Sequence, residues 1–252
     1  MPWIDPTWSV AVLLLWARLG VLLALSPLAQ AVKAPPVFWV LLTLALSGSL
    51  CAALGLRTPV PAGLGGLFLL LLSEAALGAL LGLSLHAAFA ALAMAGRLLD
   101  LQMGFGVATV LDPVTRANVP VMGAALTLVG MSVFFSVDGH HALLRGIAQV
   151  AQWVPPGALW RLPDDSALAR AMGTMFSMTV IIVAPALFML MLIELVLDFV
   201  SRVLPQMNVL FIGMPVKALV GLSTLAIAAP GMAPALRRLY ASVFDFWQMV
   251  QP

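Results

Sequence analysis

The stretch LGGLFLLLLSEAALGALLGLSLHAAFAALAMA, residues 64–95, contains a single charged side chain, Glu74. A helix needs roughly 20 mostly apolar residues to cross a bilayer, and this stretch is longer than that. Its apolar residues do not alternate with polar ones, as the strands of a membrane β-barrel would require. The stretch therefore predicts a transmembrane α-helix, and it favours an all-α membrane protein.

The composition of the whole chain has the same character. Of the 252 residues, 63% are hydrophobic and only 9% are charged, with a mean hydropathy of +1.10. A soluble domain is nearer a quarter charged. The net charge of +2 is too small and too scattered to indicate a nucleic-acid partner. The lone cysteine offers neither a disulfide nor a redox motif.

Six apolar segments are predicted to be hydrophobic helices, separated by connectors rich in proline and glycine. The segments are residues 8–31, 37–56, 64–95, 121–137, 171–198 and 209–229. The connectors lie at residues 35–36, 59–61, 155–157, 163 and 230–234. Pro185 and Pro215 fall inside apolar segments, so we expect them to kink or interrupt helices.

Two further patterns concern the ends of the chain and its orientation. Beyond Pro234, apolar residues follow helical spacing, which predicts an amphipathic helix at an interface or against a partner. The first segment has Asp5 before its apolar run and Arg18 inside it, unlike a secretory signal, so we expect it to be retained. Lys and Arg in alternate connectors number four against six, which does not orient the spans.

Glu74 lies on the same predicted helix face as Gly78 and Gly82. Glycines at four-residue spacing let a neighbouring backbone approach closely, and a carboxylate at membrane depth needs a partner or a function. Two hypotheses follow. The carboxylate either forms hydrogen bonds across a packed helix interface, which we favour, or acts as a proton relay or gate.

The same spacing returns in GRLLDLQMG, residues 96–104, where Gly96, Asp100 and Gly104 share a face. Arg97 lies three residues before the carboxylate and can reach it. We interpret this face as a second tight contact between helices.

Glu194 and Lys217 flank a predicted turn at residues 205–208, which contains Pro205, Gln206 and Asn208. If the chain reverses there, each charge lies about eleven residues from the turn, or roughly 17 Å along a helix. They could then pair within a helical hairpin. The alternative is that each side chain points toward a different partner.

Catalytic, metal-binding and cofactor-binding signals are weak throughout. The motif DGHHALL, residues 138–144, lacks the spaced Cys or acidic residues that would complete a metal site, and Asp138–Gly139 is interpreted as a turn or helix start. Nucleophile elbows, phosphate loops and dinucleotide motifs are absent from the sequence. We expect a protein that is not an enzyme and that needs no cofactor.

The stretch QMGFGVATVLDPVTRANVP, residues 102–120, lies between two apolar segments where a short polar turn is usual. Its first half is apolar and flanked by glycine, yet too short to cross a bilayer. Non-helical backbone at membrane depth is tolerated only when it is buried in protein or lines a cavity.

Two motifs together resemble one protein family. LQMGFGVATVLDP, residues 101–113, followed by PQMNVLFIGMPVKALVGL, residues 205–222, is similar to the FliR family of export-gate subunits in flagellar type III secretion. The resemblance extends over nearly the whole chain in length and span order. Its anchors are Glu74, Gly78, Gly82, Gly96, Asp100, Gln102, Gly104, Asp112, Pro113, Gly139, His140, Ala184, Pro185, Pro205, Gln206, Asn208, Gly213, Pro215 and Lys217.

The resemblance implies an architecture and a set of partners. It implies a FliP-like part over about residues 1–170, a FliQ-like helical hairpin over about 171–230 and an amphipathic tail at 231–252. One copy would join FliP and FliQ subunits in an export gate, with FlhB and FlhA as further partners and unfolded flagellar proteins as substrates. The location implied is the bacterial inner membrane, within lipid at the flagellar basal body.

In that family the loop that matches the stretch at residues 102–120 plugs the closed channel. Glycines would give its backbone freedom, apolar side chains would form the seal, and Asp–Pro would end it with a stiff turn. An ordinary buried loop is the alternative. The residues assigned to the plug are Gly104, Phe105, Gly106, Val107, Ala108, Thr109, Val110, Leu111, Asp112 and Pro113.

Three other functions remain open. The closest is the SctT subunit of virulence injectisomes; Met103, where that branch tends toward Arg, and NVLFIGMP at residues 208–215 favour the flagellar branch. A proton-coupled solute transporter could use Glu74, Glu194 and Lys217, but the sequence has no convincing repeat. An intramembrane hydrolase lacks a nucleophile–base arrangement.

Overall fold

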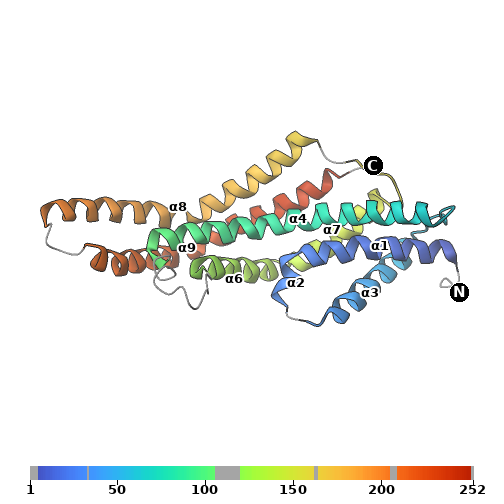
Figure 1. Cartoon of the computed structure of the whole chain (residues 1–252), viewed down its shortest axis with the longest axis horizontal. Coiled ribbons are helices and arrows are strands. Elements are labelled where there is room, and N and C mark those ends of the chain that lie inside the picture. The colour runs from blue at the N-terminus through green and yellow to red at the C-terminus, as the bar shows by residue number, and fades with distance from the viewer. Residues whose placement is uncertain (1–4, 33, 106–119, 162–163, 205–208, 251–252) are drawn as a thin grey trace. The chain divides into compact units, whose positions relative to one another are not determined.

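The computed structural model describes residues 5–32, 34–105, 120–161, 164–204 and 209–250, and every regular element within them is an α-helix. Five of the helices are long and apolar enough to cross a membrane, and α6 with α7 would add a sixth as one interrupted span. The expectation of an all-α, multi-pass membrane protein is confirmed. The helices are α1 (Pro6–Leu25), α2 (Pro27–Ala31), α3 (Pro36–Leu54), α4 (Leu64–Met103), α6 (Val121–Ser136), α7 (Gly139–Trp153), α8 (Asp165–Val203) and α9 (Val209–Gln248) (Figure 1).

Several helix boundaries differ from the prediction. The first segment breaks at Ser26, whose hydroxyl accepts a hydrogen bond from the amide of Ala29 and so starts α2. In contrast, α8 continues through Pro185, and α9 continues through Pro215 and the supposed connector at residues 230–234. The connector prediction is wrong, because apolar helices of membrane proteins tolerate proline where neighbouring groups satisfy the freed carbonyls.

The helices form two compact units. Unit 1 comprises Met1–Ala87, Gly139–Met172 and Ser242–Pro252; unit 2 comprises Ala88–Asp138 and Gly173–Ala241. The divisions fall within α4, α8 and α9, so each of these helices contributes residues to both units.

In unit 1, α1 packs between α3 and the first part of α4 (Figure 1). A Cβ added to Gly78 would overlap the backbone carbonyl of Arg18, and one added to Gly82 would lie 2.8 Å from the carbonyl oxygen of Leu22. The predicted glycine face therefore permits a close helix crossing, as expected. On the other side of α1, the indole of Trp16 donates to the hydroxyl of Thr43, 3.0 Å away.

The start of α1 is capped by Asp5. Its carboxylate accepts hydrogen bonds from the hydroxyl and the amide of Thr7, at 2.6 and 3.0 Å, and pairs with Arg57. The hydrogen bond from the Thr7 hydroxyl is the main reason that the pKa of Asp5 is lowered from its ordinary value, followed by the bond from the Thr7 amide; the charge of Arg57 also lowers it.

In unit 2, three aromatic rings join α4, α6 and α9. Phe89 stacks on Tyr240 with ring centroids 5.6 Å apart, and Phe134 meets Tyr240 edge-on at 5.2 Å. The hydroxyl of Tyr240 donates to the carbonyl oxygen of Gly130 at 2.6 Å. A Tyr hydroxyl that is buried needs such a partner, so this bond allows the ring to lie in the core.

The apolar face predicted beyond Pro234 is helical and is largely buried within the chain itself. Leu236, Leu239, Tyr240, Val243 and Trp247 are all at most 3% exposed. Sequence reasoning had assigned this face to an interface or a partner. It missed that the helix continues from α9 and packs against other helices of the same chain.

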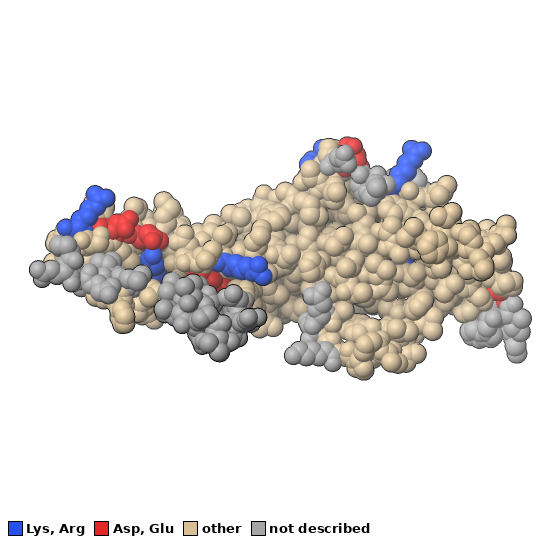
Figure 2. Space-filling view, in the orientation of Figure 1, with Lys and Arg blue, Asp and Glu red and all other residues tan. Residues whose placement is uncertain are grey.

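Large apolar side chains remain exposed on α8 and α9 of unit 2. Phe188, Phe199, Phe211 and Ile227 are 59–81% exposed. On the face that Figure 2 shows, charged residues are sparse and most of the surface is uncharged. Such an area must be covered by lipid or by other proteins.

Candidate functional site

A buried ion pair forms the polar centre of unit 1. The Nε of Arg18 on α1 lies 2.6 Å from Oε2 of Glu74 on α4, and the two side chains are 2% and 3% exposed. Glu74 thus forms hydrogen bonds across a packed helix interface, as the favoured hypothesis expects. Sequence reasoning missed its partner, although a single Arg inside an apolar run is itself a signal that a buried acid lies nearby.

The same pair holds the irregular segment that follows α7. Glu74 Oε1 accepts from the amide of Gly157 at 2.7 Å, and Arg18 Nη1 donates to the carbonyl of Val154 at 3.0 Å. The hydroxyl of Thr58 donates to the carbonyl of Pro156 at 2.6 Å. Non-helical backbone in an apolar protein needs such partners, so these side chains stabilise the break in the helix.

In unit 2, Asp100 on α4 binds the start of α6. Its Oδ1 accepts from the amide of Met122 at 2.9 Å, and its Oδ2 accepts from the amide of Gly123 at 3.3 Å. The first amides of a helix have no partner inside the helix, and the helix dipole favours a negative charge there. Arg97 is exposed, and the pair with Asp100 that its position allows is absent from the described structure.

The two helices cross closely beside this cap. A Cβ added to Gly96 would collide with the backbone of Gly123, so the predicted tight contact is present. Gly104 ends α4 with a φ of +83°, a conformation that favours glycine. It packs against the side chain of Met214 from α9. The chain therefore leaves α4 and enters α6 at neighbouring, fixed positions.

Of the two arrangements left open for Glu194 and Lys217, the structure has the pair within the hairpin. Nζ of Lys217 on α9 lies 2.8 Å from Oε1 of Glu194 on α8. The Lys217 side chain is 17% exposed and that of Glu194 is 49% exposed, so the pair is open on the side of the acid. Most ion pairs this exposed to water contribute at most about 1 kcal/mol, but an apolar covering would strengthen this one.

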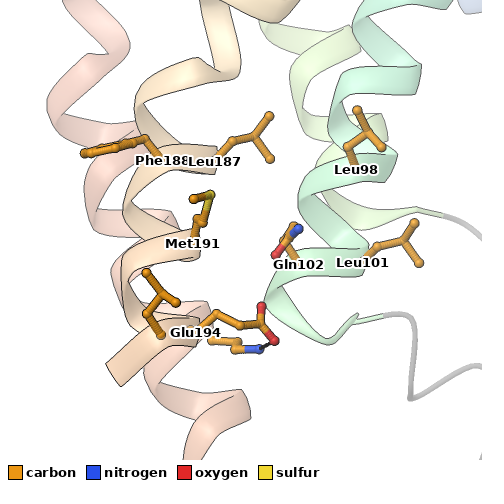
Figure 3. Close-up of a pocket in the computed structure, with 9 residues that line it drawn as sticks. Leu98, Leu101, Gln102, Leu187, Phe188, Met191 and Glu194 are labelled. Carbon is orange, nitrogen blue, oxygen red and sulfur yellow. Dashed lines mark hydrogen bonds and ion pairs between the residues drawn. The ribbon is translucent and has the colours of Figure 1, made fainter. Parts of the chain in front are cut away.

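A groove of about 690 Å³ lies beside this pair in unit 2. In Figure 3, Gln102 on α4 faces Leu187 and Met191 on α8, and Glu194 lies at the end of the groove. Gln102 is exposed and makes no hydrogen bond within the described part of the chain. The groove is otherwise lined by apolar side chains, namely Leu98, Leu101, Phe188 and Leu195 with the stem of Lys217.

Some predicted residues lie outside the described part of the chain. These are residues 106–113 of the assigned plug, and Pro205, Gln206 and Asn208 of the predicted turn. His140 and His141 start α7 with ring centroids 4.1 Å apart, and Asp138 before them has a φ of 56°, so the expected turn and helix start are confirmed.

The sequence of this chain is similar to a known family of bacterial proteins. The family model described as "Bacterial export proteins, family 1" matches residues 9–243. The chain belongs to this family. It is 34% identical to the flagellar biosynthetic protein FliR of Pectobacterium carotovorum over 70% of the chain and 68% of that protein. It is 31% identical to FliR of Bacillus subtilis, over 70% of each.

A protein named for a secretion system matches as well. The secretion system apparatus protein SsaT of Salmonella typhimurium is 29% identical over 64% of this chain and 63% of that protein. The resemblance inferred from the motifs is thus confirmed at the level of the bacterial export protein family. The two relatives above 30% identity named here are both flagellar biosynthetic proteins.

Proposed function

We propose that this chain is the core membrane subunit of a flagellar type III export gate, located in the bacterial inner membrane at the flagellar basal body. With FliP and FliQ it forms the channel through which unfolded flagellar proteins leave the cell. FlhB and FlhA are further partners, and other components supply the energy. The observation that carries this proposal is the family match over residues 9–243, together with flagellar relatives above 30% identity.

The stretch Gly104–Pro113 is proposed as the plug of the closed channel. Support comes from the helices on either side of it, α4 and α6. Asp100 holds the amides of Met122 and Gly123, so the chain leaves and returns at one fixed point of unit 2. A segment anchored at both ends can yield to a passing polypeptide and return to the same position. Its apolar residues are suited to excluding water and ions.

The exposed apolar faces of α8 and α9 are proposed to bind FliP and FliQ. Phe199 and Phe211 are 68% and 77% exposed, and large apolar side chains exposed together usually mark a surface that binds lipid or another protein. We further propose that residues 1–170 are the FliP-like part, 171–230 the FliQ-like hairpin and 231–252 its tail. In this arrangement the Glu194–Lys217 pair joins the two arms of the hairpin.

Deletion of residues 106–110 tests the plug. In cells that assemble the complex, we expect the deletion to make the membrane leak ions while export continues. The measurement is ion leakage alongside export, with the amount of purified complex as the control for assembly. An assembled complex in a tight membrane would show that the seal lies elsewhere.

Co-purification tests the assembly. A tagged chain should bring FliP and FliQ with it, and Phe199→Lys should release them, because the charge replaces an exposed apolar contact. Leu159→Lys is the matched control, since Leu159 is 87% exposed but lies outside α8 and α9. If the chain purifies alone and stays folded, the export-gate proposal fails and a transporter becomes the better reading.

An SctT-type injectisome subunit is the second candidate, favoured by the 29% identity to SsaT. The two are separated by complementation. We expect the chain to restore motility to cells that lack FliR and not to restore virulence secretion to cells that lack the injectisome subunit. The opposite result would assign it to the injectisome.

A further inference from the structure

In unit 1, α7 has one apolar face and one polar face. Leu143, Ile147 and Val150 are buried, while Arg145 and Gln149 point outward one turn apart. Trp153, a further turn along, is 39% exposed. An amphipathic helix with Arg and Trp along its edge is typical of the boundary between lipid and water.

A pocket of about 210 Å³ lies between this polar face and the end of α9. Arg145, Gln149 and Trp153 line it from α7, and Phe244 and Gln248 line it from α9. These five residues are spaced four positions apart along each helix, so two helix faces meet at the pocket.

The walls of the pocket are fixed by close packing. A Cβ added to Gly146 would lie 2.9 Å from the ring of Trp247, so α7 and α9 are in tight contact there. The indole of Trp247 donates to the hydroxyl of Ser84 on α4 at 2.8 Å, which holds its orientation. The pocket is therefore formed before any ligand arrives.

The polar groups in the pocket have no partner within the described part of the chain. Arg145, Gln149 and Gln248 form neither a hydrogen bond nor an ion pair there. Their exposed ends offer a guanidinium and two amides. A guanidinium can bind two oxygens of a phosphate side by side, and an amide can donate to a third.

We propose that this pocket binds the phosphate of an anionic phospholipid headgroup. The position favours a lipid over a soluble phosphate. The candidate interrupted span of α6 and α7 ends at Trp153 in this pocket, and headgroups lie at the ends of spans. Trp153 is 39% exposed there, and Trp is enriched where a protein meets the headgroup layer.

Native mass spectrometry of the full-length chain in its purified complex tests the site. Phosphatidylglycerol is added in increasing amounts, and the number of lipids retained is counted for each variant. We expect Arg145→Gln to raise the dissociation constant of the most tightly held phosphatidylglycerol about five-fold, which is the effect of losing one arginine contact with an anionic lipid. Ala142→Phe, which fills the pocket from α7, should act in the same direction.

The matched control is Arg237→Gln, which removes an exposed arginine of α9 outside the pocket and should leave retention unchanged. Equal retention by the wild-type, Arg145→Gln and Ala142→Phe proteins would overturn the proposal. Equal retention of zwitterionic phosphatidylcholine would overturn the preference for anionic lipid. Displacement of the lipid by millimolar inorganic phosphate would show that the pocket takes a free anion instead.

Discussion

Replacement of Glu74 by Gln separates the two roles that a buried carboxylate could have. Gln keeps an oxygen that can accept from Gly157 but removes the charge that Arg18 faces at 2.6 Å. Arg18 would then be a buried cation without a counter-ion, in a site only 2% exposed. We expect a strongly destabilised protein.

The magnitude follows from the geometry of the pair. Two unit charges 2.6 Å apart attract by about 6 kcal/mol at an effective dielectric constant of about 20. Removing both ions from water costs several kcal/mol each, so the net contribution of the pair is much smaller. Removing one partner leaves the other desolvated and unpaired, which costs about 3–5 kcal/mol. A further nitrogen of Arg18, Nη2, is already buried without a hydrogen-bond partner in the described structure.

The assay is denaturation of the purified complex, followed by loss of helix signal or by proteolysis. Arg18→Met combined with Glu74→Gln is the matched control, because removing both charges should recover most of the lost stability. The reasoning is refuted if Glu74→Gln lowers the unfolding free energy by less than about 1 kcal/mol, or if the double variant is as unstable as the single one. A stable Glu74→Gln protein that no longer exports would instead indicate a proton relay.

Three further results are expected. Gly78→Ala should cost about 1–3 kcal/mol because its Cβ overlaps a backbone carbonyl, whereas Gly48→Ala, with open space around it, should be neutral or stabilising in the same thermal denaturation. Asp100→Ala should cost about 0.5–2 kcal/mol through the lost cap of α6, and hydrogen exchange should show the first amides of α6 opening while those of α7 stay protected. The pKa of Asp5 is lowered in the folded protein, so its ionised carboxylate stabilises the fold above the unfolded pKa of about 3.9, and this stabilisation is lost as the pH falls through the folded pKa. An Asp5→Asn protein should lack this part of the pH dependence of stability. An acid-unfolding profile equal to that of the wild type would contradict this role of Asp5.

Local patterns determined much of this protein. Apolar length predicted the helices, because each span must satisfy its backbone internally and bury its side chains. The spacing of Glu74, Gly78 and Gly82 predicted a close crossing, and equal distance from a turn made the Glu194–Lys217 pair one of two possible arrangements. These inferences succeed because they depend on contacts set by helix periodicity and hairpin geometry alone.

Tertiary structure decided which partner each polar group found. Asp100 binds the start of α6 and not Arg97, its neighbour in sequence. Glu74 binds Arg18, which lies 56 residues away in the chain. The extent of α9 also differs from the local signal: the helix continues through Pro230, which by itself predicts a break, and places Tyr240 in the core of unit 2. The sequence by itself determined which residues could not be left in lipid. Only the fold decided what they bind, because in an apolar environment a polar group takes whichever partner packing brings within reach.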